Sequence, residues 1–313
     1  MGRTQGLEGY PRGHFVVAFS DELAQGELRR LHYFGRELVL FRDAEGRPRV
    51  LSAHCPHRGA HLGVGGSVVG GEVRCPFHGF QFDGRGRCTK IPSGGRVPEE
   101  ARLEVFETTE RNGMITVRYD RGGVAPDYEL PELPECLDPE YSPWMVRTLR
   151  VRTHPREIVE NVVDFAHFEP VHETCAERFE NEFRGHLAVQ RSEGVGAPTH
   201  RFAGTAYRIE AVYHGPGVQF SRFESRGIRV VFVNANTMID EGTVDLRFGV
   251  RVATGGDPRY HEGFLRHFIG DLQRGYEQDV AIWEHKVFRE HPVLAEGDGP
   301  IGELRRWYRQ FYT

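Results

Sequence analysis

The sequence has no apolar run near the roughly 20 residues that a membrane-spanning helix needs. It also lacks the basic and then apolar opening of a secretory signal, and its net charge of −5 argues against a nucleic-acid-binding protein. Cysteine is scarce, because the 313 residues include only five, and this odd number indicates no disulfide framework. We therefore expect a cytoplasmic protein with reduced thiols and room for two domains of ordinary size.

Two of the five cysteines stand in a regular pattern with two histidines. Cys55-x-His57 is followed, after seventeen residues, by Cys75-x2-His78. One thiolate and one imidazole from each loop form the ligand set of a Rieske [2Fe–2S] centre, in which two cysteines hold one iron and two histidines hold the other. Zinc is the alternative, but zinc fingers pair cysteine with cysteine and histidine with histidine. The spacing therefore favours the iron–sulfur cluster.

A second group of metal-binding residues is expected near the middle of the chain. Asp164 and His167 are three residues apart, so they share one face of a helix that we expect from about Pro155 to Phe168. Pro170 is expected to end this helix, which lets the chain double back and bring His172 to His167. Two imidazoles and a carboxylate around one ion form the triad of Fe(II) sites that activate O2. The alternative is an ordinary helix that carries these side chains by chance.

The carboxylate of the triad is expected from a second, longer helix, which begins at Asp257-Pro258 and ends before His291. Its apolar stripe is formed by Phe268, Leu272, Tyr276, Val280 and Trp283. Asp279 falls within this stripe, and a carboxylate that faces a core is costly unless it is paired or bound to metal. Asp279 is therefore the expected ligand. Glu277 and Glu284 are the alternatives, and a surface position or a salt bridge for Asp279 also stays open.

The order of the expected elements indicates an α+β protein. Short strand-like runs fill the first third of the chain: His14–Phe19, Glu37–Phe41, Arg49–Ala53, Glu72–Cys75, Phe80–Asp83 and Met114–Asp120. A proline-rich linker, residues 122–143, follows a boundary that we place near Arg121. After it we expect a strand over residues 145–152, the first helix with Thr153 as N-cap, four β-rich runs between about Ala188 and Val252, and the long helix. This order predicts a curved antiparallel sheet that wraps a cavity against the last helix.

The motifs follow one another in a fixed order: the two cluster loops, the linker, Asn161-x2-Asp164-x2-His167-x4-His172, the strands, and Asp279-x3-Trp283. In this order the chain resembles the terminal oxygenase components of the Rieske non-haem iron oxygenases. The resemblance implies an N-terminal all-β Rieske [2Fe–2S] domain, residues 1–121. It implies a helix-grip catalytic domain over residues 122–313, with a curved antiparallel sheet and a long C-terminal helix.

The resemblance also assigns roles to single residues. The implied ligands of the [2Fe–2S] cluster are Cys55, His57, Cys75 and His78. The implied ligands of a mononuclear Fe(II) are His167, His172 and Asp279. Asn161 and Asp164 are implied to act in the active site. In a head-to-tail ring of three subunits, Asp164 is implied to bridge His167 and a cluster histidine of the neighbouring subunit, equivalent to His78.

Two further features indicate which Rieske proteins the chain resembles most. Ala60 and Phe77 stand where respiratory Rieske proteins carry cysteines that form a disulfide, which favours the oxygenase type. Residues 279–312 are similar to the tails of the 3-ketosteroid 9α-hydroxylase oxygenases and the cholesterol 7-desaturases. The implied function is therefore that of an oxygenase that hydroxylates or desaturates a bulky apolar, steroid- or sterol-like substrate with O2.

The electrons must come from a partner, because the glycine-rich run Gly63–Gly71 does not match a dinucleotide fingerprint and no flavin motif is present. The expected partner is an NAD(P)H-dependent reductase, acting directly or through a ferredoxin. Two other hypotheses stay open: a Rieske electron-transfer protein whose second domain binds a ligand, and an oxygenase for an aromatic or alkaloid substrate. The strands expected around the cavity contribute Phe202, Tyr207, Val212, Phe220, Phe223, Val231 and Phe232.

Overall fold

The computed structural model describes residues 7–120, 122, 127–196, 204–253 and 258–312. The chain divides into two compact units, which we call the cluster unit (Phe15–Ala125) and the catalytic unit (Met1–His14 with Pro126–Thr313). Arg121, where the sequence places the boundary, lies outside the described residues. None of the described helices combines the length and the apolar character that crossing a membrane requires.

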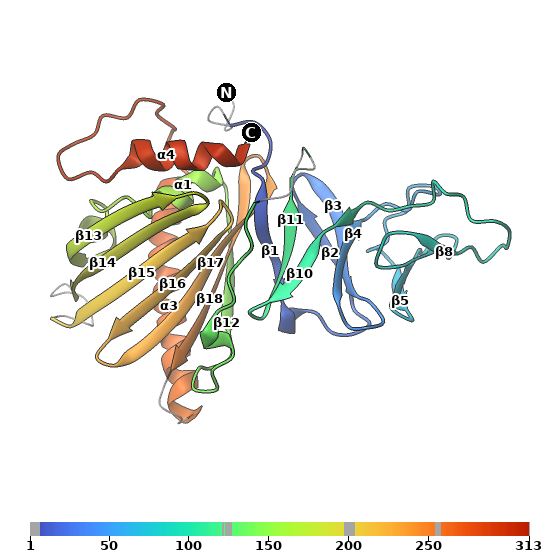
Figure 1. The fold of residues 1–313 in the computed structure, drawn as a ribbon, viewed down its shortest axis with the longest axis horizontal. Coiled ribbons are helices and arrows are strands. Elements are labelled where there is room, and N and C mark those ends of the chain that lie inside the picture. The colour runs from blue at the N-terminus through green and yellow to red at the C-terminus, as the bar shows by residue number, and fades with distance from the viewer. Residues whose placement is uncertain (1–6, 121, 123–126, 197–203, 254–257, 313) are drawn as a thin grey trace. The chain divides into compact units, whose positions relative to one another are not determined.

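The start of the chain belongs to the catalytic unit, which the sequence did not indicate. The amide of Arg12 donates a hydrogen bond to the carbonyl of Phe311 (2.7 Å), and Nε2 of His14 lies 2.9 Å from the carbonyl oxygen of Tyr128. The first of these bonds ties the start of the described chain to its end, and the second ties it to Tyr128. In Figure 1 the first described residues, in dark blue, likewise lie close to the end of α4.

The cluster unit is built from three small sheets, with strand orders β1-β11-β10, β2-β3-β4-β9 and β5-β6-β7-β8 (Figure 1). Its elements are β1 (Gly13–Phe19), the 3-10 turn η1 (Ser20–Glu22), β2 (Leu28–Tyr33), β3 (Arg36–Arg42), β4 (Pro48–Ser52), β5 (Ser67–Val69), β6 (Glu72–Arg74), β7 (Gln81–Phe82), β8 (Cys88–Lys90), β9 (Val105–Phe106), β10 (Thr108–Arg111) and β11 (Met114–Tyr119). The six predicted strands are confirmed as β1, β3, β4, β6, β7 and β11. The very short strands among the others carry too few residues for an alternating pattern to stand out.

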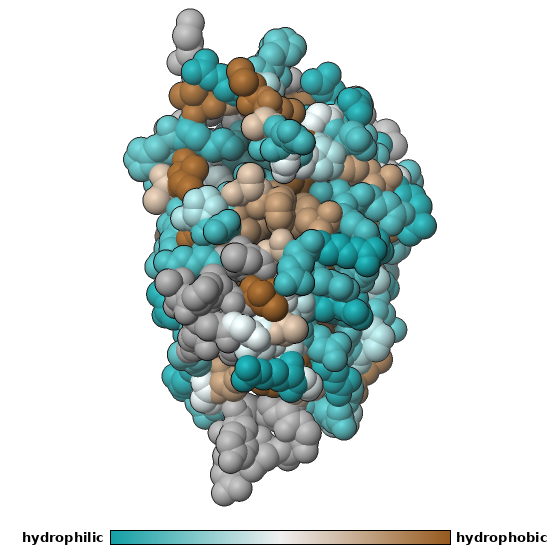
Figure 2. Space-filling model, turned by 90° about the vertical axis from the view of Figure 1, so that its left-hand side faces the viewer, coloured by the Kyte–Doolittle hydropathy of each residue, from teal (hydrophilic) through white to brown (hydrophobic). Residues whose placement is uncertain are grey.

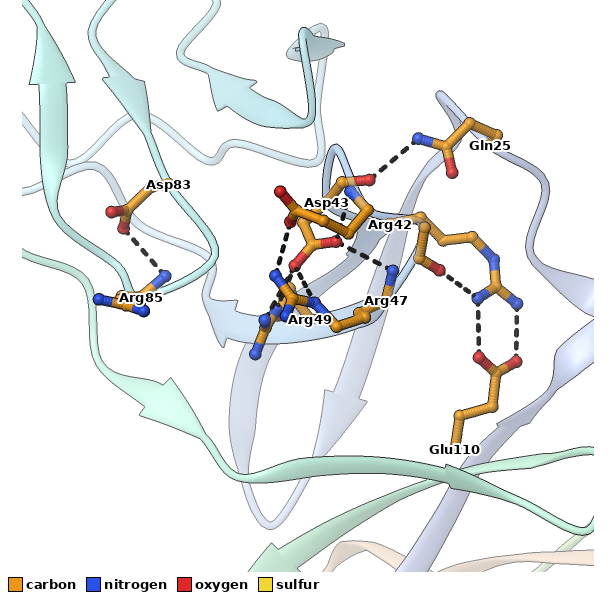
Figure 3. Close-up of polar contacts among 10 residues, drawn as sticks. Gln25, Arg42, Asp43, Arg47, Arg49, Asp83, Arg85 and Glu110 are labelled. Atoms are coloured by element: carbon orange, nitrogen blue, oxygen red, sulfur yellow. Dashed lines mark hydrogen bonds and ion pairs between the residues drawn. The ribbon is translucent and has the colours of Figure 1, made fainter.

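Asp43 closes the hairpin between β3 and β4 (Figure 3). Its carboxylate accepts hydrogen bonds from the backbone amides of Glu45 (3.1 Å) and Arg47 (2.9 Å). It also accepts from Nε of Arg47 (3.0 Å) and Nε of Arg49 (2.8 Å). Burial alone would raise the pKa of Asp43, but these donors outweigh burial and lower it. An ionised Asp43 therefore fixes the turn, and with it the register of the two strands next to the first cluster loop.

The described part of the catalytic unit contains one seven-stranded antiparallel sheet, with strand order β12-β18-β17-β16-β15-β14-β13, and four helices (Figure 1). The strands are β12 (Met145–Val151), β13 (Thr174–Arg184), β14 (Leu187–Gly196), β15 (Ala206–His214), β16 (Val218–Ser225), β17 (Ile228–Asp240) and β18 (Thr243–Ala253). The helices are α1 (Pro155–Glu160), α2 (Phe168–His172), α3 (Pro258–Trp283) and α4 (Ile301–Arg309), with 3-10 turns η2 (Pro134–Cys136) and η3 (Gln310–Tyr312).

The long helix α3 packs on the sheet and forms the core of the catalytic unit (Figure 1). Leu265, Ile269 and Trp283 of α3 are buried against Leu246 and Phe248 of β18. The predicted α+β architecture of a curved sheet against a long helix is confirmed. The helix ends at Trp283, which is before His291 as predicted but eight residues short of that limit.

The chain leaves α3 early because its next residues pack on α1. The ring of Phe288 contacts two guanidinium groups, with its centroid 3.9 Å from Cζ of Arg156 and 4.7 Å from Cζ of Arg305. Nζ of Lys286 lies 2.6 Å from the buried carboxylate of Glu157. Aromatic and ionic contacts with α1 therefore outweigh the propensity of this segment to continue the helix.

The first predicted helix is wrong in its extent. Instead of one helix over residues 155–168, α1 ends at Glu160 and α2 begins at Phe168, with turns between them. The N-cap is His154 rather than Thr153, and its Nδ1 accepts the amide hydrogen of Arg156. Pro170 lies inside the first turn of α2, where its missing N–H would have had no partner in any case. Proline therefore helps to start the second helix and does not end the first.

Candidate metal centres and substrate cavity

The two loops that carry the cysteine–histidine pairs have the same backbone conformation. The amide of Gly59 donates to the carbonyl of Cys55 (2.9 Å), and the amide of Gly79 donates to the carbonyl of Cys75 (3.1 Å). The amide of each cysteine in turn donates to the carbonyl five residues later, at 2.9 and 2.8 Å. Both glycines have φ of +72°, a left-handed conformation that side chains disfavour. Each loop is therefore a turn that its own backbone holds in place.

The four side chains of these loops form a buried pair and an exposed pair. Cys55 and Cys75 are buried, whereas His57 and His78 are exposed with their ring centroids 4.5 Å apart. The ring of His57 stacks on Phe80 at 4.6 Å. This arrangement would hold the cysteine-bound iron of a Rieske cluster inside the unit and the histidine-bound iron at its surface.

The two adjacent thiols are suited to bind a metal cluster. Burial, and then the neighbouring Cys75 thiol, raises the pKa of Cys55 to about 11, although backbone amides of the loop oppose this shift. Two thiolates side by side are therefore unfavourable here unless a cation binds both. Iron supplies that positive charge, so the donor set fits a [2Fe–2S] cluster.

His167, His172 and Asp279 are brought together although they come from separate elements. One ligand atom from each lies within 4.8 Å of the others. Oδ1 of Asp279 is 3.2 Å from Nε2 of His172 and 4.0 Å from Nε2 of His167. Atoms that bind one ion at about 2.1 Å and at right angles lie about 3 Å apart. The three side chains therefore fit a metal ion bound on one face, as in a 2-His-1-carboxylate site.

Each of the three side chains also makes a hydrogen bond through the atom that points away from the other two. Nδ2 of Asn161 donates to Oδ2 of Asp279 (3.1 Å). Nδ1 of His167 donates to the carbonyl of Asp164 (2.5 Å), and Nδ1 of His172 lies 3.3 Å from Oε1 of Gln278. A proton on each Nδ1 leaves each Nε2 free to bind metal. Gln278 was not expected from the sequence, because a single exposed amide on a helix gives no signal of function.

The alternative carboxylates point elsewhere. Glu277 is exposed and accepts a hydrogen bond from Nε2 of Gln273 (2.8 Å). Glu284 accepts one from the backbone amide of Arg152 (2.9 Å). Asp279, in contrast, is 5% exposed on the inner side of α3. Of these three acidic residues, Asp279 alone joins the two histidines.

The triad lies in the wall of a cavity of about 640 Å³ in the catalytic unit. Tyr207, Phe223 and Phe232 line this cavity as expected. Val212, Phe220 and Val231 do not, because they alternate with lining residues and face the other side of the sheet, and Phe202 lies outside the described residues. The described sheet residues also contribute polar side chains that the sequence did not indicate: Gln190, Ser192, Gln219, Ser221 and Asn234. Figure 2 shows the face on the side of β13 and β14, where hydrophobic residues gather near the middle of a mainly hydrophilic surface.

Comparison with known proteins covers nearly the whole chain. Residues 13–106 match the Rieske [2Fe-2S] domain, and residues 117–312 match the 3-ketosteroid 9alpha-hydroxylase C-terminal domain. The chain is 35% identical to a 3-ketosteroid-9-alpha-monooxygenase oxygenase component of Rhodococcus rhodochrous, over 97% of this chain and 82% of that protein. This chain belongs to the 3-ketosteroid 9α-hydroxylase family of Rieske oxygenases.

Two further relatives extend the comparison. A cholesterol 7-desaturase of Ciona intestinalis is 29% identical over 97% of this chain and 69% of its own length. The crystal structure of dicamba monooxygenase bound to dicamba has the same fold, with a TM-score of 0.83 at 20% identity over 97% of this chain and 98% of that one.

Membership in this family decides between the hypotheses from the sequence. This chain is therefore an oxygen-using oxidoreductase, the oxygenase component of a Rieske system. Its cofactors are a [2Fe–2S] cluster and a mononuclear iron. The hypothesis of a simple electron carrier with a ligand-binding second domain is therefore wrong.

Proposed function

We propose that this protein hydroxylates a steroid- or sterol-like substrate with O2, using electrons from a separate NAD(P)H-dependent reductase, directly or through a ferredoxin. The observation that carries this proposal is the position of the three converging ligands in the wall of a 640 Å³ cavity. That volume lies within the usual range for sites that enclose a small molecule. The steroids in the names of the relatives support the substrate class, and the desaturase among them makes desaturation the second candidate outcome.

The proposed roles follow the contacts of each residue. Cys55, His57, Cys75 and His78 would hold the cluster, and His167, His172 and Asp279 would hold the iron. When bound, the cluster supplies single electrons and the iron activates O2 against a C–H bond. Asn161 holds one oxygen of Asp279 and so turns the other oxygen toward the two histidines.

The wall of the cavity near α3 supplies the dry surface that such chemistry needs. Leu272, Tyr276 and Trp283 of α3 line it together with Leu246 and Phe232 of the sheet. These side chains exclude water from the substrate and offer an apolar surface to a fused-ring skeleton.

We further propose that three copies of the chain form a ring and that the protein works in the cytoplasm, where NAD(P)H is available. In this ring Asp164 would receive a cluster histidine of the neighbouring copy. Its carboxylate lies 3.5 Å from Nδ1 of His167, and its side chain is still 42% exposed. Burial tends to raise the pKa of Asp164, but the hydrogen bond and charge of His167 outweigh burial and lower it. An ionised, accessible carboxylate behind an iron ligand is suited to accept a second imidazole N–H.

The bridging role is tested with Asp164→Asn, which keeps the size of the side chain and removes its charge. The variant should retain its cluster, its iron and its state of association, while turnover falls on the order of 100-fold because electrons reach the iron slowly. After rapid mixing of the reduced variant with substrate and O2, the absorbance of the cluster should show that it stays reduced. Oxidation at the wild-type rate would remove Asp164 from the electron path.

The substrate class is tested by NADH-dependent turnover with a surrogate reductase against ketosteroids, sterols, aromatic acids and alkaloids, with products identified by mass. Ketosteroids or sterols should gain one oxygen atom, and they should raise the melting temperature of the ferrous protein because they bind only the native state. Turnover confined to aromatic or alkaloid compounds would contradict the steroid proposal and leave the family assignment intact. Sedimentation of the holoprotein at several concentrations tests the ring of three.

A further inference from the structure

The sheet side of the cavity contains polar atoms that have no partner among the described residues. Nε2 of Gln190 and Oγ of Ser221 are both buried and make no hydrogen bond within the described part of the chain. Gln190 is 5% exposed and Ser221 is fully buried, and both side chains line the cavity. A buried donor that lacks an acceptor is costly, so two of them in one cavity wall indicate a ligand that supplies the acceptor.

The two residues lie on either side of a single small side chain. Ala211 of β15 pairs with Gln190 of β14 on one edge and with Ser221 of β16 on the other. Directly opposite residues in antiparallel strands point to the same face, at about 5 Å from strand to strand. Gln190 and Ser221 therefore flank a gap of about 10 Å between their Cα atoms, and the methyl group of Ala211 leaves that gap open to the cavity.

Other side-chain donors of the same wall already have acceptors, whereas Oδ1 of Asn234, which can only accept, is buried without a partner among the described residues. Nδ2 of Asn234 donates to Oε1 of Gln219 (2.6 Å), and the hydroxyl of Ser225 donates to the carbonyl of Ala206 (2.8 Å). Ser225 lies on the same strand as Ser221 and also lines the cavity. The unused donors are therefore particular to the positions beside Ala211.

The charge of the cavity wall indicates a neutral ligand group. Among the described residues that line it, Arg274 carries the one permanent positive charge, and it forms an ion pair with Asp271 of the same helix. Neither Gln190 nor Ser221 can balance a carboxylate or a phosphate. A carbonyl oxygen, with two lone pairs and no charge, can accept from both donors at once.

We propose that Gln190 and Ser221 form an oxygen-binding subsite over Ala211, which receives a ketone oxygen of an otherwise apolar substrate and so determines which carbon faces the triad. This inference rests on the proposed steroid substrate and deepens it, because it assigns the recognition of the oxygen to two residues of the sheet. A substrate held at one end by this subsite and along its rings by the apolar wall has a single orientation in the cavity.

The test uses three ligands with one steroid skeleton, namely a ketone, the matching alcohol and the matching deoxy compound. Their dissociation constants are measured by calorimetry with the anaerobic ferrous holoprotein. The wild type should bind the ketone at least roughly tenfold more tightly than the deoxy compound, since an unpaired buried donor is left without the oxygen. Ser221→Ala and Gln190→Met should each lower this ratio several-fold and leave the affinity for the deoxy compound near that of the wild type.

Ser225→Ala is the matched control, because it removes a hydroxyl of the same strand and cavity that is already bonded to the backbone. It should leave the ratio of ketone to deoxy affinity unchanged. The products give a second readout: Ser221→Ala and Gln190→Met should oxidise more than one carbon of the ketone, whereas the control should give the wild-type product alone.

Each failure has a distinct meaning. Unchanged ratios and products in Ser221→Ala and Gln190→Met would overturn the subsite, and so would a wild type that prefers the alcohol over the ketone. If the wild type converts steroids but binds the ketone and the deoxy compound equally, the subsite is wrong and the proposed function stands. If it neither binds nor converts any steroid, the proposed function fails and the subsite fails with it.

Discussion

The two candidate metal centres of this protein depend on the chain in different ways. The proposed cluster ligands lie on two turns separated by seventeen residues, and each turn is closed by its own backbone hydrogen bonds. Of the proposed iron ligands, His167 is the N-cap of a five-residue helix, His172 is its last residue, and Asp279 lies on α3, 118 residues from Asn161, whose amide it accepts. The first centre thus rests on local geometry, whereas the second needs the sheet and α3 to be in place. Substitutions should reveal this difference.

The largest effect is expected from Cys75→Ser, because the cluster turns have no spare ligand. A serine hydroxyl binds iron poorly, so the variant should lose the Rieske electron paramagnetic resonance signal entirely and lose all turnover. Cys88→Ser is the control, since Cys88 is a free thiol outside the two turns. A normal resonance signal in Cys75→Ser would remove this residue from the ligand set.

Asp279→Ala should separate the two centres. The variant should keep the full cluster signal because the cluster turns do not depend on α3, but it should lose about one iron per chain and all turnover. Glu277→Ala, two residues away and exposed, should retain iron and activity. The opposite result, with Glu277 essential and Asp279 dispensable, would show that the wrong face of α3 has been assigned to the iron.

The contrast between local and distant contacts also decides what the sequence could predict. The spacing of Cys55, His57, Cys75 and His78 was sufficient to place these residues on two loops, because the turns are local. Asp279 could be selected because an acidic residue inside an apolar stripe is unusual on a helix that packs on a core. The burial of Asp279 beside the two histidines agrees with that selection.

The sequence failed where packing between distant segments decides the conformation. The break between α1 and α2 was missed because proline is compatible with the first turn of a helix as well as with its end. Strand β13 was missed because this edge strand is rich in Glu and Arg and shows no apolar alternation. The polar residues Gln190 and Ser221 could not be separated from ordinary strand residues until the register placed them beside Ala211.

A smaller effect is expected behind the iron site, at Gln278. Oε1 of Gln278 fixes the orientation of His172 through Nδ1, and loss of such a partner commonly weakens metal binding by about 10–100-fold. Gln278→Leu should therefore need a higher concentration of Fe(II) for half-maximal loading, as measured by titration of the iron-free site, with the cluster signal unchanged. Gln273→Leu on the same helix should have no effect, because Gln273 bonds only Glu277 among the residues described around it. Equal iron affinity in both variants would show that Gln278 does not strengthen iron binding through His172.

The smallest effect concerns stability, and it extends the comparison from the metal centres to the units that hold them. His154 caps α1, the helix that precedes the turns leading to His167, and it is 2% exposed. Burial, and then the charge of Arg156, lowers its pKa to about 3. A histidine in the unfolded chain has a pKa near 6.5, so protonation in acid favours the unfolded state. The contribution of neutral His154 to the free energy of unfolding is fully present above about pH 6.5 and is lost as the pH falls toward 3.

Between pH 7 and pH 5 this histidine should cost the catalytic unit about 2 kcal/mol, since each unit of pH below 6.5 is worth about 1.4 kcal/mol. His154→Asn keeps a side chain that can cap the helix and removes the titration, so it should flatten the dependence on pH. Urea unfolding at the two pH values measures this change in stability through tryptophan fluorescence, because Trp144, Trp283 and Trp307 all belong to the catalytic unit. The visible absorbance of the cluster reports the unfolding of the other unit.

His285→Asn, at an exposed position, serves as the control. If His154→Asn loses stability in acid as steeply as the wild type, the acid sensitivity of this unit lies in other groups, of which His214, with a pKa lowered by burial to about 4, is the next to substitute.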